Sequence, residues 1–156
     1  MDERISNHHI EIWRGFLDAH ALALGAVERD LAAAGMPPPP WYDVLWSLAR
    51  APDGRMRIHE VADAVLLSRS GLSRLLDRME SEGLITRAVC ASDRRGAYAV
   101  ITGDGKVALR KMWPVYERSV AEHFVPHLGE EAAALRTALA RVVESARRAD
   151  ARFLAA

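Results

Sequence analysis

One short segment of the chain combines hydroxyl and guanidinium side chains at helical spacing. Ser70, Arg74 and Arg78 stand four residues apart, with Ser73 and Asp77 between them. Residues three and four apart share one face of a helix, so this spacing predicts a polar stripe on one outward surface. Long cations and short hydroxyls on such a surface suit contacts to phosphates and hydrogen bonds to the edges of nucleic-acid bases.

The same segment carries an apolar stripe that would hold the polar one in place. Its apolar residues follow the i, i+3, i+4, i+7 pattern of an amphipathic helix: Leu72, Leu75, Leu76 and Met79. Ser68 suits the N-cap, because its hydroxyl can accept a hydrogen bond from an unpaired N–H of the first turn. Gly83, just after Glu82, suits the C-terminal stop. The pattern predicts a helix between these two signals.

A shorter helix is expected immediately before this one. Residues 59–66 place Val61, Ala62 and Val65 inward, and the small Ala62 and Ala64 let two helices approach closely, as a helix-turn-helix requires. A polar helix face taken by itself is equally well explained as a solvated surface. Because another helix is expected only a few residues before it, we interpret the polar-faced helix as one that reads DNA.

Two runs of β-forming residues follow Gly83. Residues 84–89 and 98–101 are expected to pair as short strands, and a further strand is expected near residue 55. The polar segment between the paired strands carries Arg94 and Arg95 at its tip. One Arg at a hairpin tip is usually a solvated charge, whereas a pair beside a polar-faced helix favours contact with phosphates or a minor groove.

These motifs resemble the winged helix-turn-helix of the MarR (multiple antibiotic resistance regulator) family. The resemblance covers nearly the whole chain, and its most specific parts are the Ser-Arg-Leu-Leu-Asp-Arg run at 73–78 and the Asp-Arg-Arg wing at 93–95. It implies one mainly α domain, residues 1–156, with a small β-wing. A winged helix-turn-helix at about 41–102 would be flanked by dimerisation helices at about 4–36 and 103–150. The implied DNA-binding residues are Ser68, Arg69, Ser70, Ser73, Arg74, Arg78, Asp93, Arg94 and Arg95.

Two positions depart from the family pattern. Leu66 stands in the turn between the helices, where the family often has Gly, and a left-handed backbone there would cost on the order of 1 kcal/mol. Gly71 stands where Thr or another small residue is common. It lowers the stability of the first helical turn by about 1 kcal/mol relative to Ala and removes one possible hydroxyl contact.

Amphipathic helices are expected on both sides of this central part. They cover residues 4–34, 41–50, about 102–125 and about 130–150. The prolines at 37–40 end the first helix because proline lacks an N–H donor, and they form a stiff spacer. Thr102 can cap the third helix, and Pro114 is expected to kink it. The apolar faces exceed what a winged module can cover, so the terminal helices are expected to pair with a second copy, which would match a palindromic operator.

Composition agrees with one compact intracellular domain. The chain has 156 residues, half of them hydrophobic, and its 21 basic and 21 acidic residues balance. Between residues 68 and 96, however, six Arg face four acids, a local balance of +2. We therefore expect a modest basic face whose binding is sensitive to salt. The lone Cys90, the absence of a long apolar run and an amino terminus without a signal-peptide pattern predict a cytoplasmic protein.

Aromatic and His residues gather near the expected junction of the dimerisation and DNA-binding parts. They are His8, His9, Trp13, Trp41, Tyr42 and Trp46. These side chains could line a pocket for a small aromatic or anionic effector, and the resemblance places ligands in such a cleft. Packing in the core or at the dimer interface is the alternative for each of them.

Other chemistry has weaker support. Cys90 before the wing could act as a redox switch, and His123 with His127 has the spacing of two metal ligands on one helix, although Pro126 disturbs it. No catalytic constellation or phosphate-binding loop is visible, so neither an enzyme nor a cofactor is expected. The sequence predicts a homodimeric, ligand-responsive repressor of a pseudo-palindromic operator. A winged-helix protein-interaction module without a DNA role, or a thiol or metal sensor of the same fold, is the alternative.

Overall fold

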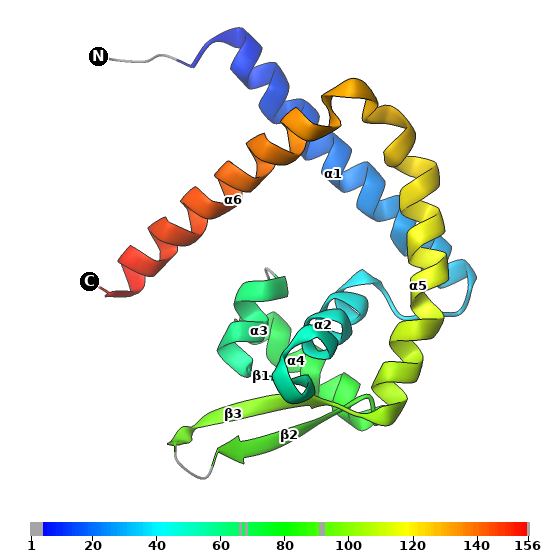
Figure 1. Cartoon of the computed structure of the whole chain (residues 1–156), viewed down its shortest axis with the longest axis vertical. Coiled ribbons are helices and arrows are strands. Elements are labelled where there is room, and N and C mark those ends of the chain that lie inside the picture. Colours follow the sequence, from blue (N-terminus) through cyan, green and yellow to red (C-terminus); the bar gives the residue numbers. More distant parts are fainter. Residues whose placement is uncertain (1–4, 66, 68, 91–92, 156) are drawn as a thin grey trace. The chain divides into compact units, whose positions relative to one another are not determined.

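A computed structural model describes residues 5–65, 67, 69–90 and 93–155. The fold is mainly helical with one small antiparallel sheet, as expected (Figure 1). The helices are α1 (Asn7–Ala33), α2 (Pro39–Arg50), α3 (Ile58–Val65), α4 (Arg69–Ser81), α5 (Gly103–His123) and α6 (Ala132–Ala155). The strands are β1 (Arg55–Arg57), β2 (Ile85–Cys90) and β3 (Asp93–Ile101). Short 3-10 helices occupy Pro52–Gly54, Val125–His127 and Gly129–Glu131. Among the described helices, none has the length and apolar character needed to span a membrane.

The chain forms two compact units that meet in sequence at Val120. The first contains the sheet and the helices from α1 through most of α5, and the second contains the end of α5 and α6. The candidate DNA-binding elements all belong to the first.

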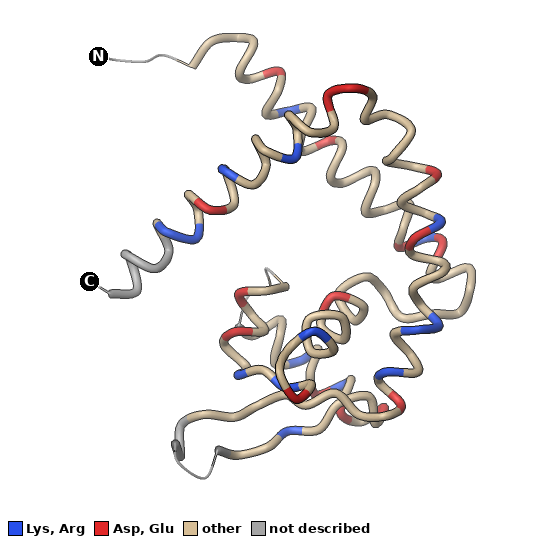
Figure 2. The backbone as a smooth tube through the Cα atoms, viewed as in Figure 1, with Lys and Arg blue, Asp and Glu red and all other residues tan. Residues whose placement is uncertain are grey.

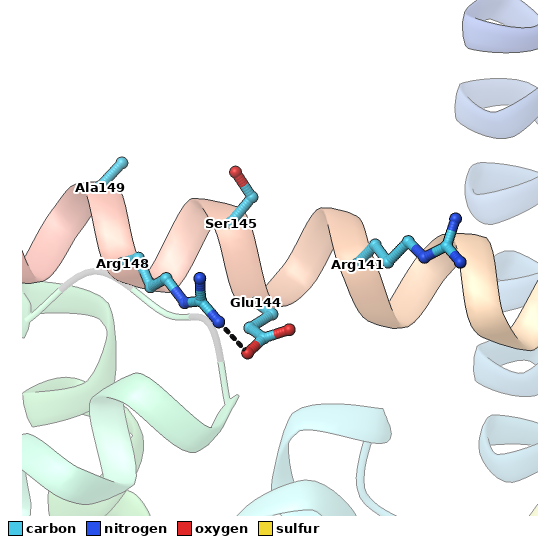
Figure 3. A pocket seen from close by; sticks show the side chains of 5 residues that line it. All are labelled: Arg141, Glu144, Ser145, Arg148 and Ala149. Carbon is cyan, nitrogen blue, oxygen red and sulfur yellow. Dashed lines mark hydrogen bonds and ion pairs between the residues drawn. The ribbon is translucent and has the colours of Figure 1, made fainter.

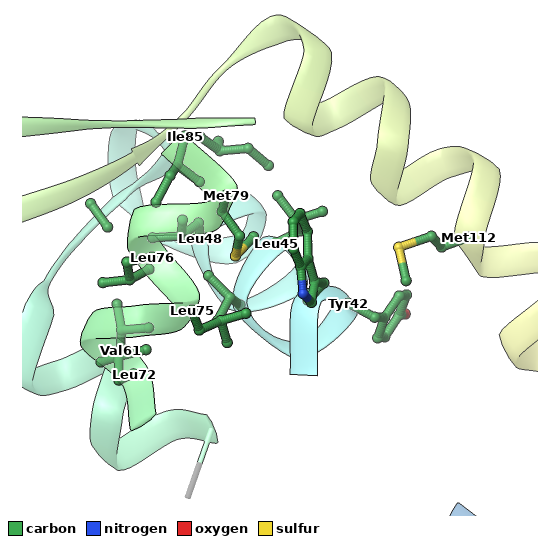
Figure 4. Packing of buried hydrophobic residues seen from close by; sticks show 14 of the residues in the cluster. Tyr42, Leu45, Leu48, Val61, Leu72, Leu75, Leu76, Met79, Ile85 and Met112 are labelled. Atoms are coloured by element: carbon green, nitrogen blue, oxygen red, sulfur yellow. The ribbon is translucent and has the colours of Figure 1, made fainter. Parts of the chain in front are cut away.

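The core of the first unit is built around the apolar stripe of α4. The four predicted residues, Leu72, Leu75, Leu76 and Met79, are at most 3% exposed. Figure 4 shows them in one cluster with Leu45 and Leu48 of α2 and Val61 of α3. Burying one such side chain contributes about 1.5–3 kcal/mol, so this stripe fixes which way α4 faces. The predicted amphipathic helix is confirmed.

The three strands form an antiparallel sheet in the order β1-β3-β2. Ile85 pairs with Ile101, and both are buried on the face that packs against the helices. The second strand of the hairpin was expected at residues 98–101. The observed strand is longer, because β3 begins at Asp93. The residues before 98 have the polar composition of a turn, but Ala97 pairs with Val89 and Asp93 pairs with Cys90, with a register shift between these two pairs. The hairpin is therefore longer than composition alone predicts.

The proline run does more than separate two helices. α1 ends at Ala33, and Gly35 follows it in the left-handed conformation, with φ of 67°. Pro39 and Pro40 then form the start of α2, two residues earlier than expected. Proline is well tolerated in a first helical turn, where its missing N–H would have no partner within the helix. Only the first two prolines act as a spacer.

Two helix ends meet at the beginning of α5. Gly83 ends α4 with φ of 73°, and the N–H of Leu84 returns to the carbonyl of Met79 at 2.9 Å, as in a Schellman motif. Thr102 caps α5, since its Oγ1 accepts a hydrogen bond from the N–H of Gly105 at 3.0 Å. The same hydroxyl lies 2.7 Å from the carbonyl oxygen of Gly83, to which it can donate. The predicted glycine stop of α4 and threonine cap of α5 are both confirmed. A hydrogen bond from the Thr102 hydroxyl to the Gly83 carbonyl connects them.

Gly105 allows this junction to close. A Cβ atom at this position would lie 2.1 Å from the carbonyl oxygen of Leu84 and 2.9 Å from Cγ1 of Ile101. A backbone oxygen cannot rotate aside as the end of a long side chain can. We predict that Gly105→Ala lowers the free energy of unfolding by about 1–3 kcal/mol, the usual cost of overpacking, although Ala is the better helix former. Urea unfolding followed by circular dichroism measures the difference.

Gly103 provides the matched control in the same turn. Apart from its chain neighbours and the backbone of its own helix, no atom lies within 4 Å of a Cβ built there. Gly103→Ala should therefore leave the free energy of unfolding unchanged or slightly raised. Equal stability of the two variants would contradict the close approach of α5 to Leu84.

Candidate nucleic-acid interface

The polar face of α4 lies on the surface of the first unit. Ser70, Ser73, Arg74 and Arg78 are exposed, as predicted, because the opposite face of the helix is buried. Leu66 and the predicted N-cap Ser68 lie outside the described residues, as does the side chain of Arg69. Within the described part, hydroxyl and guanidinium groups lie on one outward surface, whose direction is fixed by the buried apolar face of the same helix.

The β2–β3 hairpin forms the wing. In Figure 1 it extends away from the helices of the first unit. The predicted wing residues Asp93, Arg94 and Arg95 occupy the start of β3, and their side chains lie outside the described part of the structure. Their contacts with DNA stay a prediction that follows from their place at the tip of the hairpin.

Arg87 of β2 makes contacts that the sequence analysis did not foresee. Its Nη1 lies 2.7 Å from Oδ1 of Asp77 and 3.2 Å from Oε2 of Glu80. Its backbone N–H also donates to Oε1 of Glu80 at 3.0 Å. The guanidinium therefore joins the first strand of the wing to two carboxylates of α4. Helical periodicity gives no signal for this group, because its members lie on different elements.

The basic surface is consequently more local than the charge count implies. Arg87, counted among the six arginines of the expected basic face, is engaged by Asp77 and Glu80. Figure 2 shows Lys and Arg interspersed with Asp and Glu along the described chain. Among the arginines of α4 with described side chains, the exposed charge consists of Arg74 and Arg78. Its effect on phosphate binding should therefore be short-ranged and screened by salt.

The predicted effector-binding residues have different surroundings. Trp41 and Tyr42 are buried in the core cluster. Trp46 is exposed, with the Arg50 guanidinium 4.8 Å from its ring centre. Exposed Trp13 stacks on Phe16 of its own helix, at 6.0 Å between ring centres. His9 contacts Ser6, its Nδ1 lying 2.9 Å from Oγ. Their role in binding an effector stays a prediction.

An aromatic stack between α2 and α5 involves one of these residues and two others that the sequence analysis missed. Tyr42 lies 4.3 Å from Tyr116 and 6.1 Å from Trp113, measured between ring centres. Burial raises the pKa of Tyr42, and Tyr116, Asp43 and Glu117 raise it further. Burial and then the Asp43 carboxylate raise the pKa of Tyr116. Burial also raises the pKa of the Asp43 carboxyl above its usual range. A carboxylate beside two phenols thus lies in a poorly solvated place.

The structure tests the His123/His127 pair considered for metal binding but not the candidate redox residue Cys90. The side chain of Cys90 lies outside the described part of the structure. His123 is the last residue of α5, whereas His127 belongs to the following 3-10 helix. The two histidines therefore do not lie on one face of a continuous helix. An i, i+4 pair of metal ligands needs such a face.

A shallow pocket lies along α6 in the second unit. Figure 3 shows its lining residues, Arg141, Glu144, Ser145, Arg148 and Ala149. Arg148 and Glu144 form an ion pair one turn apart. All five lining residues belong to one exposed helix, and the predicted effector residues are not among them.

Comparison with known proteins finds relatives in sequence and in fold. A model of the MarR family matches residues 34–96. The chain is 34% identical to AbsC, a MarR family transcriptional regulator from Streptomyces coelicolor, with a TM-score of 0.82 over 92% of this chain and 97% of AbsC. It is 27% identical to Sco3205, a MarR family regulator of the same organism solved in complex with DNA, with a TM-score of 0.82 over 94% of this chain and 91% of Sco3205. BpsR of Bordetella bronchiseptica, whose DNA binding is regulated by 6-hydroxynicotinic acid, is 17% identical and shares the fold, with a TM-score of 0.74 over 85% of this chain and 98% of BpsR.

The raised pKa of Asp43 predicts a stability that depends on pH. Between the ordinary Asp pKa of 3.8 and the raised one, the folded protein binds more protons than the unfolded chain. Stability therefore falls as the pH rises through this window, and the penalty persists above it. We predict that Asp43→Asn has a higher thermal midpoint than the wild type at neutral pH. The difference should disappear below the ordinary Asp pKa.

Thermal unfolding of both proteins over a series of pH values measures this effect. Asp63→Asn, at an exposed position of α3, is the matched control and should follow the wild-type profile. An Asp43→Asn variant less stable than the wild type at neutral pH would contradict the burial penalty.

Proposed function

We propose that this chain, which belongs to the MarR family of transcriptional regulators, binds a pseudo-palindromic operator as a homodimer and controls transcription there. The outward face of α4 carries this proposal most directly. Its exposed Ser70, Ser73, Arg74 and Arg78 have the donors needed for base edges and phosphates, and the buried stripe gives them a fixed direction. The related Sco3205 was solved in complex with DNA.

The wing is proposed as the second DNA contact. The expected contacts are phosphates or an adjacent minor groove, where Arg is favoured by the negative potential. Arg94 and Arg95 carry this role, with Asp93 beside them at the start of β3. In this arrangement the helix reads the major groove, and the wing adds affinity and a dependence on flanking sequence.

An apolar surface on α1 supports the dimer. Several large side chains on one broad side of the helix are exposed in the single chain: Ile12, Trp13, Phe16, Leu17 and Leu24. Exposed apolar patches of this kind usually mark an interface. On α6, Leu135, Val142 and Val143 are also exposed. We propose that α1 and α6 pair with a second copy, which would place two α4 helices on the half-sites of one operator.

We further propose that the protein is a cytoplasmic repressor that a small effector releases from DNA. A ligand can act only through different affinities for the DNA-bound and free conformations. An aromatic or anionic compound held by residues from the group of His9, Trp13, Trp41, Tyr42 and Trp46 is the expected effector. The regulation of BpsR by 6-hydroxynicotinic acid is a property of that relative, and it makes an aromatic acid a reasonable first compound to test.

The alternative, an interaction module without a DNA role, has less support. Such a surface would more often present apolar anchors. The described outward face of α4 instead carries Ser, Arg and Asp side chains. A regulatory rather than catalytic role also agrees with the family.

Substitution of Arg74 tests DNA reading. The probe is a duplex selected by the wild-type protein from a random-sequence pool, titrated at two salt concentrations. Arg74→Ala should cost about 1–3 kcal/mol of binding free energy and, if the contact is to a base, relax the preference at one operator position. Arg95→Ala should weaken binding with less change in that preference, and should alter the response to flanking A/T content.

Arg14→Ala is the control, because Arg14 is exposed on the polar side of α1, away from the proposed DNA-binding elements. Its affinity should equal that of the wild type. Wild-type affinity in both the Arg74 and the Arg95 variant would mean that this face does not touch DNA, and the interaction-module alternative would then be favoured.

Substitution of Phe16 tests the dimer. Size-exclusion chromatography with light scattering should report about twice the chain mass at micromolar concentration for the wild type. Phe16→Glu should shift the protein toward the monomer and weaken operator binding, because it places a charge in an apolar interface. Asp18→Lys, two residues along and thus on the opposite side of α1, should leave the mass unchanged. A monomeric wild type that binds its operator would exclude the proposed assembly.

A further inference from the structure

We infer that Arg87 is a positioning residue for DNA binding, which shields the carboxylates of α4 from the DNA and braces the wing against that helix. The inference rests on the proposed DNA-binding function. It concerns a residue of β2 that the expected contact surface does not include. Three observations carry it: the place of Asp77, the geometry of the guanidinium, and the connection of β2 to the wing.

Asp77 stands among the cations of the proposed recognition face. It lies three residues after Arg74 and one before Arg78, and its side chain is 58% exposed. A carboxylate in this position would repel the phosphates that the two arginines attract. Arg87 lies 2.7 Å from it and supplies the opposite charge. Because the same guanidinium also contacts Glu80, it lowers the net charge of the group from −2 to −1.

Glu80 is engaged at both of its oxygens. Oε1 accepts the backbone N–H of Arg87 at 3.0 Å, and Oε2 accepts from its guanidinium at 3.2 Å. The other terminal nitrogen, Nη2, lies 3.5 Å from the carbonyl oxygen of Ser73. One side chain therefore contacts three positions spread along two turns of α4. A planar guanidinium can donate to several acceptors at once. A lysine ammonium is a compact point charge and does this less well.

The brace links two parts that would meet different grooves. α4 carries the proposed major-groove contacts, and β2 is the first strand of the wing. Because Arg87 is 30% exposed and held by several partners, its conformational freedom is small. We expect the spacing between the recognition helix and the wing tip to depend on this group.

Four proteins test the inference: the wild type, Arg87→Met, Asp77→Asn and the Arg87→Met/Asp77→Asn double variant. Each is titrated with the duplex selected by the wild type. Arg87→Met should weaken binding about 5- to 20-fold, since it changes the net charge of the group formed with Asp77 and Glu80 from −1 to −2 near DNA phosphates. Asp77→Asn alone should change the affinity less than about threefold, because its charge is already shielded. The double variant should recover a substantial part of the lost affinity.

A conservative variant separates shielding from bracing. Arg87→Lys keeps the charge but not the fork, so it should bind more tightly than Arg87→Met and less tightly than the wild type. Arg14→Met controls for the loss of one positive charge elsewhere and should not change the affinity. Light scattering and thermal unfolding of every variant show whether the dimer and the fold persist, and affinities are compared among the variants that keep both.

The outcomes distinguish this inference from the proposed function. If the wild type binds no selected duplex, the proposed function fails. If Arg74→Ala weakens binding while Arg87→Met does not, only the role of Arg87 is excluded. A folded, dimeric Arg87→Met variant whose loss of affinity is not reduced by Asp77→Asn would exclude the shielding role. Equal affinity of Arg87→Lys and the wild type would exclude the brace.

Discussion

The burial of one face of α4 is the interaction on which the rest of this structure depends. Its apolar side chains pack against α2 and α3, and this packing determines which residues of the same helix face outward. A helix whose apolar stripe is fixed in a core has little freedom to rotate about its axis. The direction of Arg74 and Arg78 is therefore a consequence of the packing of residues such as Leu76, which is fully buried.

Polar contacts then attach the sheet and α5 to that helix. On one side, Arg87 joins β2 to Asp77 and Glu80. At the end of the helix, Thr102 bonds to the turn at Gly83, and Gly105 lets α5 approach the carbonyl of Leu84. Wing, recognition helix and α5 consequently share one junction. A displacement of α5 relative to the core would therefore be passed to β2 and α4 through this junction.

Little positive charge is available for DNA binding. The chain has no net charge, and nearby acids engage one of the arginines counted toward its basic segment. A neutral body reduces non-specific attraction to DNA, so affinity must come from a few well-placed donors. A carboxylate beside those donors therefore lowers DNA affinity unless a nearby cation offsets its charge. Asp43, half-buried beside Tyr42 and Tyr116, has no such cation among the described residues, and burial raises the pKa of its carboxyl.

Local patterns in the sequence determined the helices, the stripe of α4, the Thr102 cap and the Gly83 stop, because each depends on residues within one or two turns. The fold class and the outward Ser/Arg face followed from them. Only the tertiary structure decided that Arg87 pairs with Asp77 and Glu80, that Gly105 lies against Leu84, and that Tyr42 stacks on Tyr116. These contacts join different elements, and no periodicity reports them. The length of β3 belongs with them, since pairing with β2 overrides the turn-like composition of its first residues.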